Sequence, residues 1–146
     1  MLTACSDGAP SCPFTGTPDR APSAGCFVAS RDGLLLVQAL NGQVSPPGGS
    51  SESSESAQCT AFRETWEETG LRVQTGELLQ VFDTGFYLYR CERDVLSGDI
   101  DPPMRFEVRA AFYVPAARFD SYEWRFPKQQ LVLKNMLLDV TDKTSQ

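Results

Sequence analysis

Three glutamates in the middle of the chain have a spacing that suits metal-assisted chemistry. Glu64, Glu67 and Glu68 stand at positions i, i+3 and i+4, so a helix would carry all three within roughly 100° of one face. Like charges this close repel one another, and the ordinary interpretation is a solvated acidic face. The same face would also suit a divalent cation, because Mg²⁺ prefers oxygen ligands and commonly takes one or two carboxylates together with substrate phosphate oxygens.

The composition narrows the chemistry further. The 146 residues include no histidine, which excludes Ser-His-Asp and Cys-His catalysis and histidine zinc sites. Acid or base chemistry must therefore use carboxylates, tyrosine, lysine or cysteine. A net charge of -6, from 13 Lys+Arg and 19 Asp+Glu, argues against a nucleic acid or an anionic membrane as partner. No apolar run approaches the ~18 residues of a membrane-spanning helix, so no transmembrane segment is expected.

A helix that positions these glutamates is predicted from the same stretch. Residues 57–69 contain no glycine or proline, their acidic and apolar side chains segregate at helical spacing, and Gly70 stands where a C-cap is expected. Arg63 is placed to neutralise one or two of the carboxylates. The face opposite the glutamates, which suits burial, carries Cys59, Phe62 and Trp66.

Short strands flank this helix along the chain. Asp32-Gly33 between the apolar runs 26–29 and 34–37 predicts a β-hairpin, and the glycines and prolines of 41–49 predict an irregular loop. The remaining elements are strands at 71–73, 78–82, 85–91 and 106–114, a loop at 92–103 and a closing helix over 127–138. Strands on both sides of a central helix predict an α/β fold with a mixed sheet covered by helices.

The length corresponds to about one domain. Residues 1–23 are rich in proline, serine and glycine, and their prolines interrupt any helical or strand register. We therefore expect a flexible N-terminal arm over 1–23 and the folded domain over 24–146.

The glutamates belong to a longer pattern with a known counterpart. Gly49, Glu55 and the run Arg63-Glu64-Thr65-Trp66-Glu67-Glu68-Thr69-Gly70-Leu71 together resemble the Nudix box, the signature of the Nudix hydrolase family. Every charged and glycine position agrees, and Thr65 departs from the pattern because the family usually has an aliphatic residue there. The resemblance implies a Nudix-type α/β/α sandwich with a mixed β-sheet.

The resemblance also implies a metal site and a reaction. Glu64, Glu67 and Glu68 are expected to hold Mg²⁺ or Mn²⁺, with the Gly49 carbonyl as a further ligand. The family cleaves a nucleoside diphosphate linked to another group, by attack of water on phosphorus. The expected partner is accordingly a small nucleotide-like substrate and no nucleic acid, and the protein is expected to be a monomer or a homodimer.

Other roles in the reaction follow from the same resemblance. Glu55 and Arg63 are expected to pair and to brace the loop against the helix. Glu67 is the favoured general base among the glutamates of the box. A carboxylate outside the box, Glu107 or Glu123, is the alternative base. The arginines placed to meet phosphate oxygens are Arg105, Arg109 and Arg125.

The N-terminus and the cysteines suggest export. Leu2-Thr3-Ala4-Cys5 is similar to the lipobox of bacterial lipoproteins, which makes Cys5 a candidate for lipid attachment. The box and the cysteine positions are also similar to those of bacterial cell-envelope Nudix domains. That similarity implies a disulfide between Cys91 and either Cys26 or Cys59, with free buried thiols as the alternative. The periplasm or cell envelope is thus favoured as location, and the cytoplasm is the alternative.

Two further functions compete with hydrolysis. A Nudix fold could bind a nucleotide-like ligand without cleaving it, although the intact glutamates argue against such a sensor. An envelope interaction domain would instead depend on disulfides and on the N-terminal arm.

Overall fold

The structure, a computed structural model, describes residues 8–103 and 108–144, and its strands form two four-stranded sheets. The first has the strand order β5-β1-β7-β6. It consists of β1 (Ser23–Phe27), β5 (Gly48–Ser50), β6 (Val73–Val81) and β7 (Phe86–Arg93). β1 runs parallel to β7, whereas the β1–β5 and β6–β7 pairs are antiparallel. The sheet is therefore mixed, as predicted.

The second sheet is built around one inner strand, β3 (Gly33–Ala39). Its members are β2 (Ala29–Ser30), β3 (Gly33–Ala39), β4 (Val44–Ser45) and β8 (Val108–Val114). β2, β4 and β8 each pair with β3 in antiparallel orientation. The predicted hairpin is present between β2 and β3, where Ser30 opposes Gly33 across a two-residue turn. A side chain at Gly33, whose φ is 125°, would collide with the backbone of Val114.

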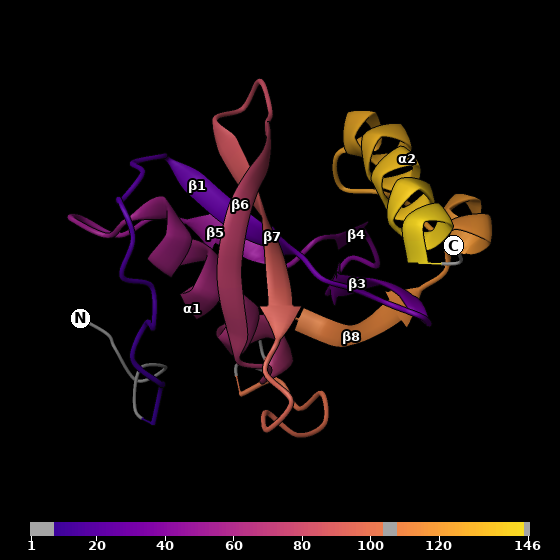
Figure 1. The fold of residues 1–146 in the computed structure, drawn as a ribbon. Coiled ribbons are helices and arrows are strands. Elements are labelled where there is room, and N and C mark those ends of the chain that lie inside the picture. The colour runs from indigo at the N-terminus through magenta and orange to yellow at the C-terminus, as the bar shows by residue number, and fades with distance from the viewer. Residues whose placement is uncertain (1–7, 104–107, 145–146) are drawn as a thin grey trace.

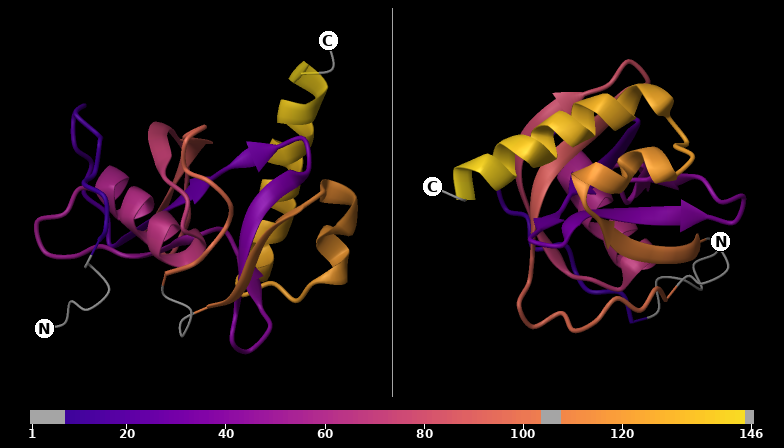
Figure 2. Two further views of the ribbon diagram at one scale, coloured as in Figure 1. Left: turned by 90° about the horizontal axis from the view of Figure 1, so that it is seen from below. Right: turned by 90° about the vertical axis from the view of Figure 1, so that its right-hand side faces the viewer.

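Two helices cover the strands from opposite sides (Figures 1 and 2). α1 (Ala57–Thr69) has the predicted bounds, and α2 (Pro127–Thr144) begins at the predicted proline but is longer than predicted. A short 3₁₀ helix, η2 (Ala116–Ser121), precedes α2 and was not predicted. Within the described residues, no helix combines the length and apolar character needed to cross a membrane.

β1 and β3 are buried on both faces, which explains their continuous apolar runs. In β1, Cys26 packs in the core cluster beside α1, whereas the next residue, Phe27, packs in the cluster beside α2. In β3, Leu35 faces the first cluster, whereas Leu34 and Leu36 face the second. This alternation follows from the two-residue period of a strand.

Two sequence predictions of secondary structure need correction. The separate strands expected at 71–73 and 78–82 are one strand, β6, with register shifts after Thr75 and after Leu78. Gly76 lies in this irregular part, and glycine commonly marks such a bulge. The loop expected over 41–49 includes β4 and the start of β5. Gly48 pairs with Gly25 of β1, and this close approach is open only to residues without a side chain.

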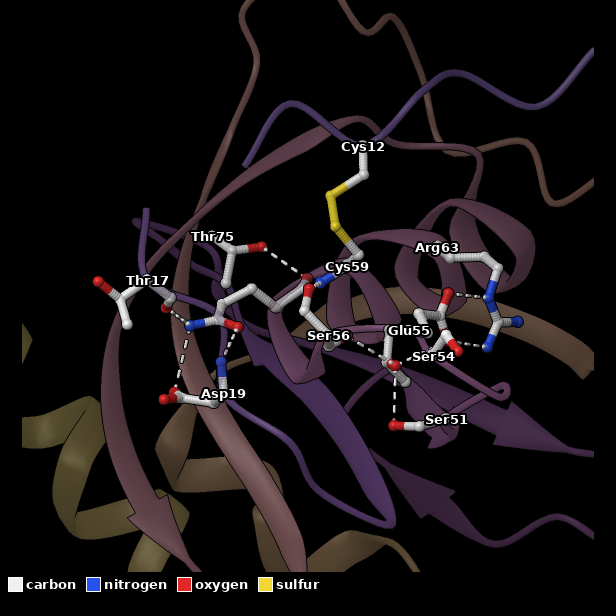
Figure 3. The surroundings of a disulfide bond; sticks show 12 residues. Cys12, Thr17, Asp19, Ser51, Ser54, Glu55, Ser56, Cys59, Arg63 and Thr75 are labelled. Atoms are coloured by element: carbon white, nitrogen blue, oxygen red, sulfur yellow. Dashed lines mark hydrogen bonds and ion pairs between the residues drawn. A yellow bond between two sulfur atoms is a disulfide. The ribbon is translucent and has the colours of Figure 1, made fainter. Parts of the chain in front are cut away.

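The N-terminal segment 8–22 has no helix or strand, as its prolines predict, but it is attached to the domain and is not a free arm. Asp19 donates its backbone N–H to Gln58 of α1 (2.9 Å), and Gln58 donates to the Thr17 carbonyl (3.2 Å) (Figure 3). The hydroxyl of Tyr89 in β7 donates to Asp19 (2.7 Å). Burial and this hydrogen bond raise the pKa of Tyr89 above its usual range.

Two disulfides reinforce these contacts. Cys12 is bonded to Cys59 of α1, and Cys26 of β1 is bonded to Cys91 of β7. Of the two partners predicted for Cys91, the structure thus has Cys26, and it pairs Cys59 with a cysteine that was not considered. Cys5, the predicted lipid-attachment residue, lies outside the described residues.

Candidate active site

Helix α1 is fixed at both ends by capping. The Ser56 side chain accepts the backbone N–H of Cys59 (3.1 Å) at the N-terminus. Gly70 adopts a left-handed conformation (φ 79°) at the C-terminus, and its N–H donates to the carbonyl of Trp66 (2.8 Å). The buried residues of the helix are Ala57, Gln58, Thr60, Ala61, Phe62, Thr65 and Thr69. Of the three side chains expected on the buried face, Phe62 is therefore buried, whereas Cys59 and Trp66 are only partly buried.

The acidic face of α1 lies against β5. The backbone N–H of Gly48 donates to Oε1 of Glu68 (2.9 Å). A Cβ atom at Gly49 would stand 2.5–2.7 Å from the carboxyl group of Glu64, which is closer than real Cβ contacts. The glycines therefore let the backbone of β5 reach two carboxylates of the helix. Any side chain at Gly49 would displace Glu64.

Arg63 is the hub of a polar network beside this contact. Its Nε and Nη2 donate to the two oxygens of Glu55 (2.8 and 3.0 Å), and Nη2 also donates to the Ser50 carbonyl (2.9 Å). Its Nη1 donates to Glu64 (3.0 Å) and to Glu67 (3.3 Å). Arg63 thus contacts two of the box carboxylates, Glu64 and Glu67, as the sequence predicted, and it pairs with Glu55 as the resemblance implied. Figure 3 shows Glu55 and Arg63 side by side.

Glu55 is held from several sides. Thr60 donates its hydroxyl to Oε1 (2.7 Å), as does the backbone N–H of Glu52 (2.9 Å). Burial alone would raise the pKa of Glu55, but the hydrogen bonds from Arg63, Glu52 and Thr60 together hold it below its usual value. Burial opposes the charge of Arg63, yet its carboxylate partners raise the pKa of its guanidinium. Both groups are therefore ionised at neutral pH.

The donor set on this face fits a hard divalent cation. Glu64 and Glu67 supply carboxylates whose side chains are only 14% and 13% exposed, and three carboxylates share one guanidinium, so negative charge is in excess within this set. Among the described residues, no group of three aspartate, glutamate or cysteine side chains is arranged to hold one metal ion. A cation on this face would compete with Arg63 for the oxygens of Glu64 and Glu67.

A cavity of about 200 Å³ lies beside the same glycines. Gly48 and Gly49 line it, and Phe86 of β7, Arg125 and Phe126 line it from other directions. The guanidinium of Arg125 lies 5.0 Å from the centre of the Phe126 ring. An anionic ligand in this cavity would lie between a cationic side chain and the backbone that reaches the carboxylates.

The other predicted site residues are distributed differently. Arg109 is exposed on β8, and Glu123 is exposed before α2; neither is among the residues that line this cavity. Glu123 contributes its backbone carbonyl, which accepts the N–H of Val44 (2.9 Å). Arg105 and Glu107 lie outside the described residues.

Phe86 and Gln129 are among the cavity residues that sequence reasoning missed. The Phe86 ring packs against the backbone of Gly25 and Gly48, a contact between distant segments that no local pattern signals. Gln129 offered a signal, because it stands four residues before buried Leu133 and so occupies the apolar face of α2. A polar residue at such a position indicates a buried polar contact or a ligand.

Comparisons with known proteins agree with this arrangement. A family model described as the NUDIX domain matches residues 19–134. A curated protein of Streptomyces ambofaciens, named as a MutT-like protein, is 40% identical over 70 residues, which are 47% of this chain and 46% of that protein. The chain thus spans about half the length of this relative.

Solved structures share the fold. An ADP-ribose pyrophosphatase from Streptococcus suis superposes with a TM-score of 0.66 and 21% identity, covering 82% of this chain and 92% of that chain. A UDP-X diphosphatase superposes with a TM-score of 0.69 and 19% identity, covering 88% of this chain and 68% of that chain. At these identities the likeness concerns the fold.

Proposed function

The chain belongs to the NUDIX domain family, and from this membership we propose that it is a metal-dependent pyrophosphohydrolase of nucleoside diphosphates joined to another group. The observation that carries the proposal is the contact between the backbone of β5 and the acidic face of α1. Gly48 bonds to Glu68 and Gly49 abuts Glu64, and both glycines line the cavity that Arg125 borders. A diphosphate in this cavity would contact the glycine backbone that reaches the carboxylates.

The metal in this proposal is Mg²⁺ or Mn²⁺. Glu64, Glu67 and Glu68 would hold it, together with the carbonyl of Gly49. When bound, such an ion neutralises the charge of the diphosphate and makes water a stronger nucleophile. The hard oxygen donors suit either ion, and the absence of histidine from the sequence disfavours softer metals.

The general base in this proposal is Glu67. Its side chain is 13% exposed and is oriented by Arg63. Glu67 would accept the proton of the attacking water as the new O–P bond forms and the anhydride P–O bond breaks, with the leaving phosphate carrying away the electron pair. Glu123 is the weaker alternative because its side chain is exposed, whereas that of Glu67 is mostly buried.

Two arginines would have different roles. Arg125 would bind phosphate oxygens, since it borders the cavity directly. Arg63 would act through others, because it spans Glu55 on the loop and Glu64 and Glu67 on the helix. It is thus a positioning residue that keeps the carboxylates oriented before the cation binds.

We propose an oxidising compartment, such as the periplasm or the outer surface of the cell, as the location. The two disulfides support it, because disulfides of this kind are rare in the reducing cytosol. Counting free thiols in protein isolated from its native source under non-reducing conditions tests the assignment. Five free thiols would contradict it.

The direct test of hydrolysis is a substrate panel assayed with Mg²⁺ and with EDTA. ADP-ribose, a UDP-sugar, a dinucleoside tetraphosphate and the common nucleoside triphosphates represent the classes that the proposal includes. We expect metal-dependent release of phosphate-containing products from at least one of them. Tight binding without turnover of any compound would favour a ligand sensor instead.

A further inference from the structure

Residues 12–22, which we call the strap, run beside the start of α1 and bind it at several points. The Cys12–Cys59 disulfide joins the strap to the first turn of the helix. Asp19 contacts the helix again, because its carbonyl accepts the backbone N–H of Ala57 (2.8 Å). The strap therefore fixes the start of the helix that carries the glutamates.

The strap also holds the loop that precedes α1, residues 51–56. Arg20 donates from its guanidinium to the carbonyl of Ser54 (2.8 Å). The carbonyl of Pro22 accepts the backbone N–H of Ser51 (3.0 Å). The loop is thus bound to the strap near both of its ends.

One residue of this loop has a strained backbone. Among the residues that the structure describes, Ser54 is the one residue other than glycine with a positive φ, at 67°. A side chain makes this left-handed conformation unfavourable, so it persists only where surrounding contacts impose it. Ser54 directly precedes Glu55, whose carboxylate pairs with Arg63 (Figure 3). Losing the hold of the strap on Ser54 would let the loop relax and would move Glu55 relative to Arg63.

The disulfide fixes the strap to the helix covalently. Hydrogen bonds to the strap can exchange with water, whereas the bond at Cys12 keeps the strap at a high effective concentration beside the helix. Cys12 and Cys59 are only partly buried, so a soluble dithiol can reach them. Such a dithiol reduces the bond by thiol–disulfide exchange: two electrons and two protons pass to Cys12 and Cys59, which become thiols, and the reductant becomes a disulfide.

We propose that the strap is a positioning element of the active site and that the Cys12–Cys59 bond controls it. With the bond closed, the loop presents Glu55 to Arg63 and the glutamates of α1 stay oriented; with the bond reduced, the loop loosens and turnover falls. The inference rests on the proposed function in taking these carboxylates to act in hydrolysis. It goes further by making activity depend on oxidation, so that the enzyme would be fully active only in an oxidising compartment.

Hydrogen exchange and kcat, both measured on the full chain before and after mild treatment with dithiothreitol, test this proposal. Mass spectrometry after alkylation confirms that only Cys12–Cys59 has opened. The amides of Ser51 and Ala57, which donate to the strap, should exchange faster after reduction, while those of β3 stay protected. With Mg²⁺ and the best substrate of the panel, kcat should fall about tenfold. It should recover when oxidised glutathione re-forms the bond.

Four variants separate positioning from a general loss of structure. Cys12→Ser combined with Cys59→Ser should have the low kcat from the start and should not respond to dithiothreitol. Ser54→Gly should lose less kcat on reduction than wild type, because glycine adopts a left-handed backbone without strain; a merely structural bond predicts no such rescue. Arg20→Ala should lower kcat of the oxidised protein. The matched control is Arg31→Ala, at the exposed turn between β2 and β3, which should not.

The possible outcomes are distinct. Unchanged exchange of Ser51 and Ala57 after reduction would overturn the proposal. Faster exchange with unchanged kcat would refute control of turnover, and an equal loss of kcat in wild type and Ser54→Gly would refute the role of the strained loop. If exchange responds as expected but the oxidised protein hydrolyses no substrate of the panel, the proposed function fails while the control of the loop by the disulfide stands.

Discussion

The guanidinium of Arg63 binds both oxygens of the Glu55 carboxylate, through two hydrogen bonds of 2.8 and 3.0 Å. Glu55 lies on the loop before α1, whereas Arg63 lies in the middle of the helix. The pair therefore joins the loop that follows the glycines of β5 to the helix that carries the glutamates. Both side chains are mostly buried, at 20% and 14% exposed, so the pair is screened less than a surface ion pair.

Replacing Glu55 with glutamine should weaken this connection without changing its shape. We expect a loss of about 1–2 kcal/mol of stability, because hydrogen bonds to a charged group are lost. We also expect kcat to fall about tenfold to a hundredfold, since Arg63 would no longer hold the helix carboxylates in place. Thermal unfolding and steady-state kinetics measure the two effects. Glu77→Gln on β6, where Glu77 pairs with Arg90 at the surface, is the control and should change neither.

The same carboxylate predicts how stability depends on pH. The pKa of Glu55 is lower in the folded protein than its ordinary value of 4.5. The folded state therefore binds this proton more weakly than the unfolded state, and the ionised group stabilises the fold above about pH 5. That stability is lost as the pH falls through the folded pKa. Unfolding measured from pH 7 to pH 3 should show a shallower decline for Glu55→Gln than for wild type; parallel curves would contradict this.

The same substitution, threonine to valine, should have opposite effects on stability at Thr65 and at Thr69. Both are fully buried, but the Thr65 hydroxyl has no hydrogen-bond partner among the described residues. The Thr69 hydroxyl donates to the Thr65 carbonyl (2.6 Å) and accepts the N–H of Leu71 (3.1 Å). Thr65→Val should stabilise the protein by about 1 kcal/mol, and Thr69→Val should destabilise it by about 1–3 kcal/mol. Denaturant unfolding measures both changes in stability. Equal changes in the two variants would contradict this prediction.

The two disulfides should differ in how readily they are reduced. Cys26 and Cys91 are buried, at 0% and 3% exposed, whereas Cys12 and Cys59 are only partly buried. A thiol reductant should therefore cleave Cys12–Cys59 first, which mass spectrometry after alkylation detects. The bonds enclose separations of 47 and 65 residues, so removing either should cost about 4 kcal/mol by the chain-entropy model. Cleavage of Cys26–Cys91 first would contradict the prediction.

The sequence predicted the helix of the box best, because several independent signals coincide there. Residues 57–69 contain no glycine or proline, they have helical periodicity, and Gly70 follows them as a C-cap. These signals together predicted the bounds of α1 that the structure shows. The strands were harder to delimit. β5 consists of Gly48–Ser50, and glycines that pair closely with another strand carry the same local signal as a loop. β6 was divided because its irregular part interrupts the alternation.

In the site too, the features that depend on neighbouring residues were predicted, and those that depend on residues distant in the sequence were not. The glutamates of the box follow from their spacing along one helix. From the sequence, Arg125 was one of three candidate arginines, and no local signal distinguished it from the other two. Its place beside the cavity depends on how the start of α2 and the β6–β7 turn are arranged in space. The attachment of residues 8–22 depended on Gln58 and Cys12, whose partners are distant in sequence.

Whether the acidic face of α1 carries out the hydrolysis is tested by kcat of Glu67→Gln with Mg²⁺ on the best substrate of the panel. If Glu67 is the base, kcat should fall by at least a hundredfold, while the melting temperature stays close to that of wild type and Glu77→Gln remains fully active. A Glu67→Gln protein that is folded and retains wild-type kcat would contradict the account.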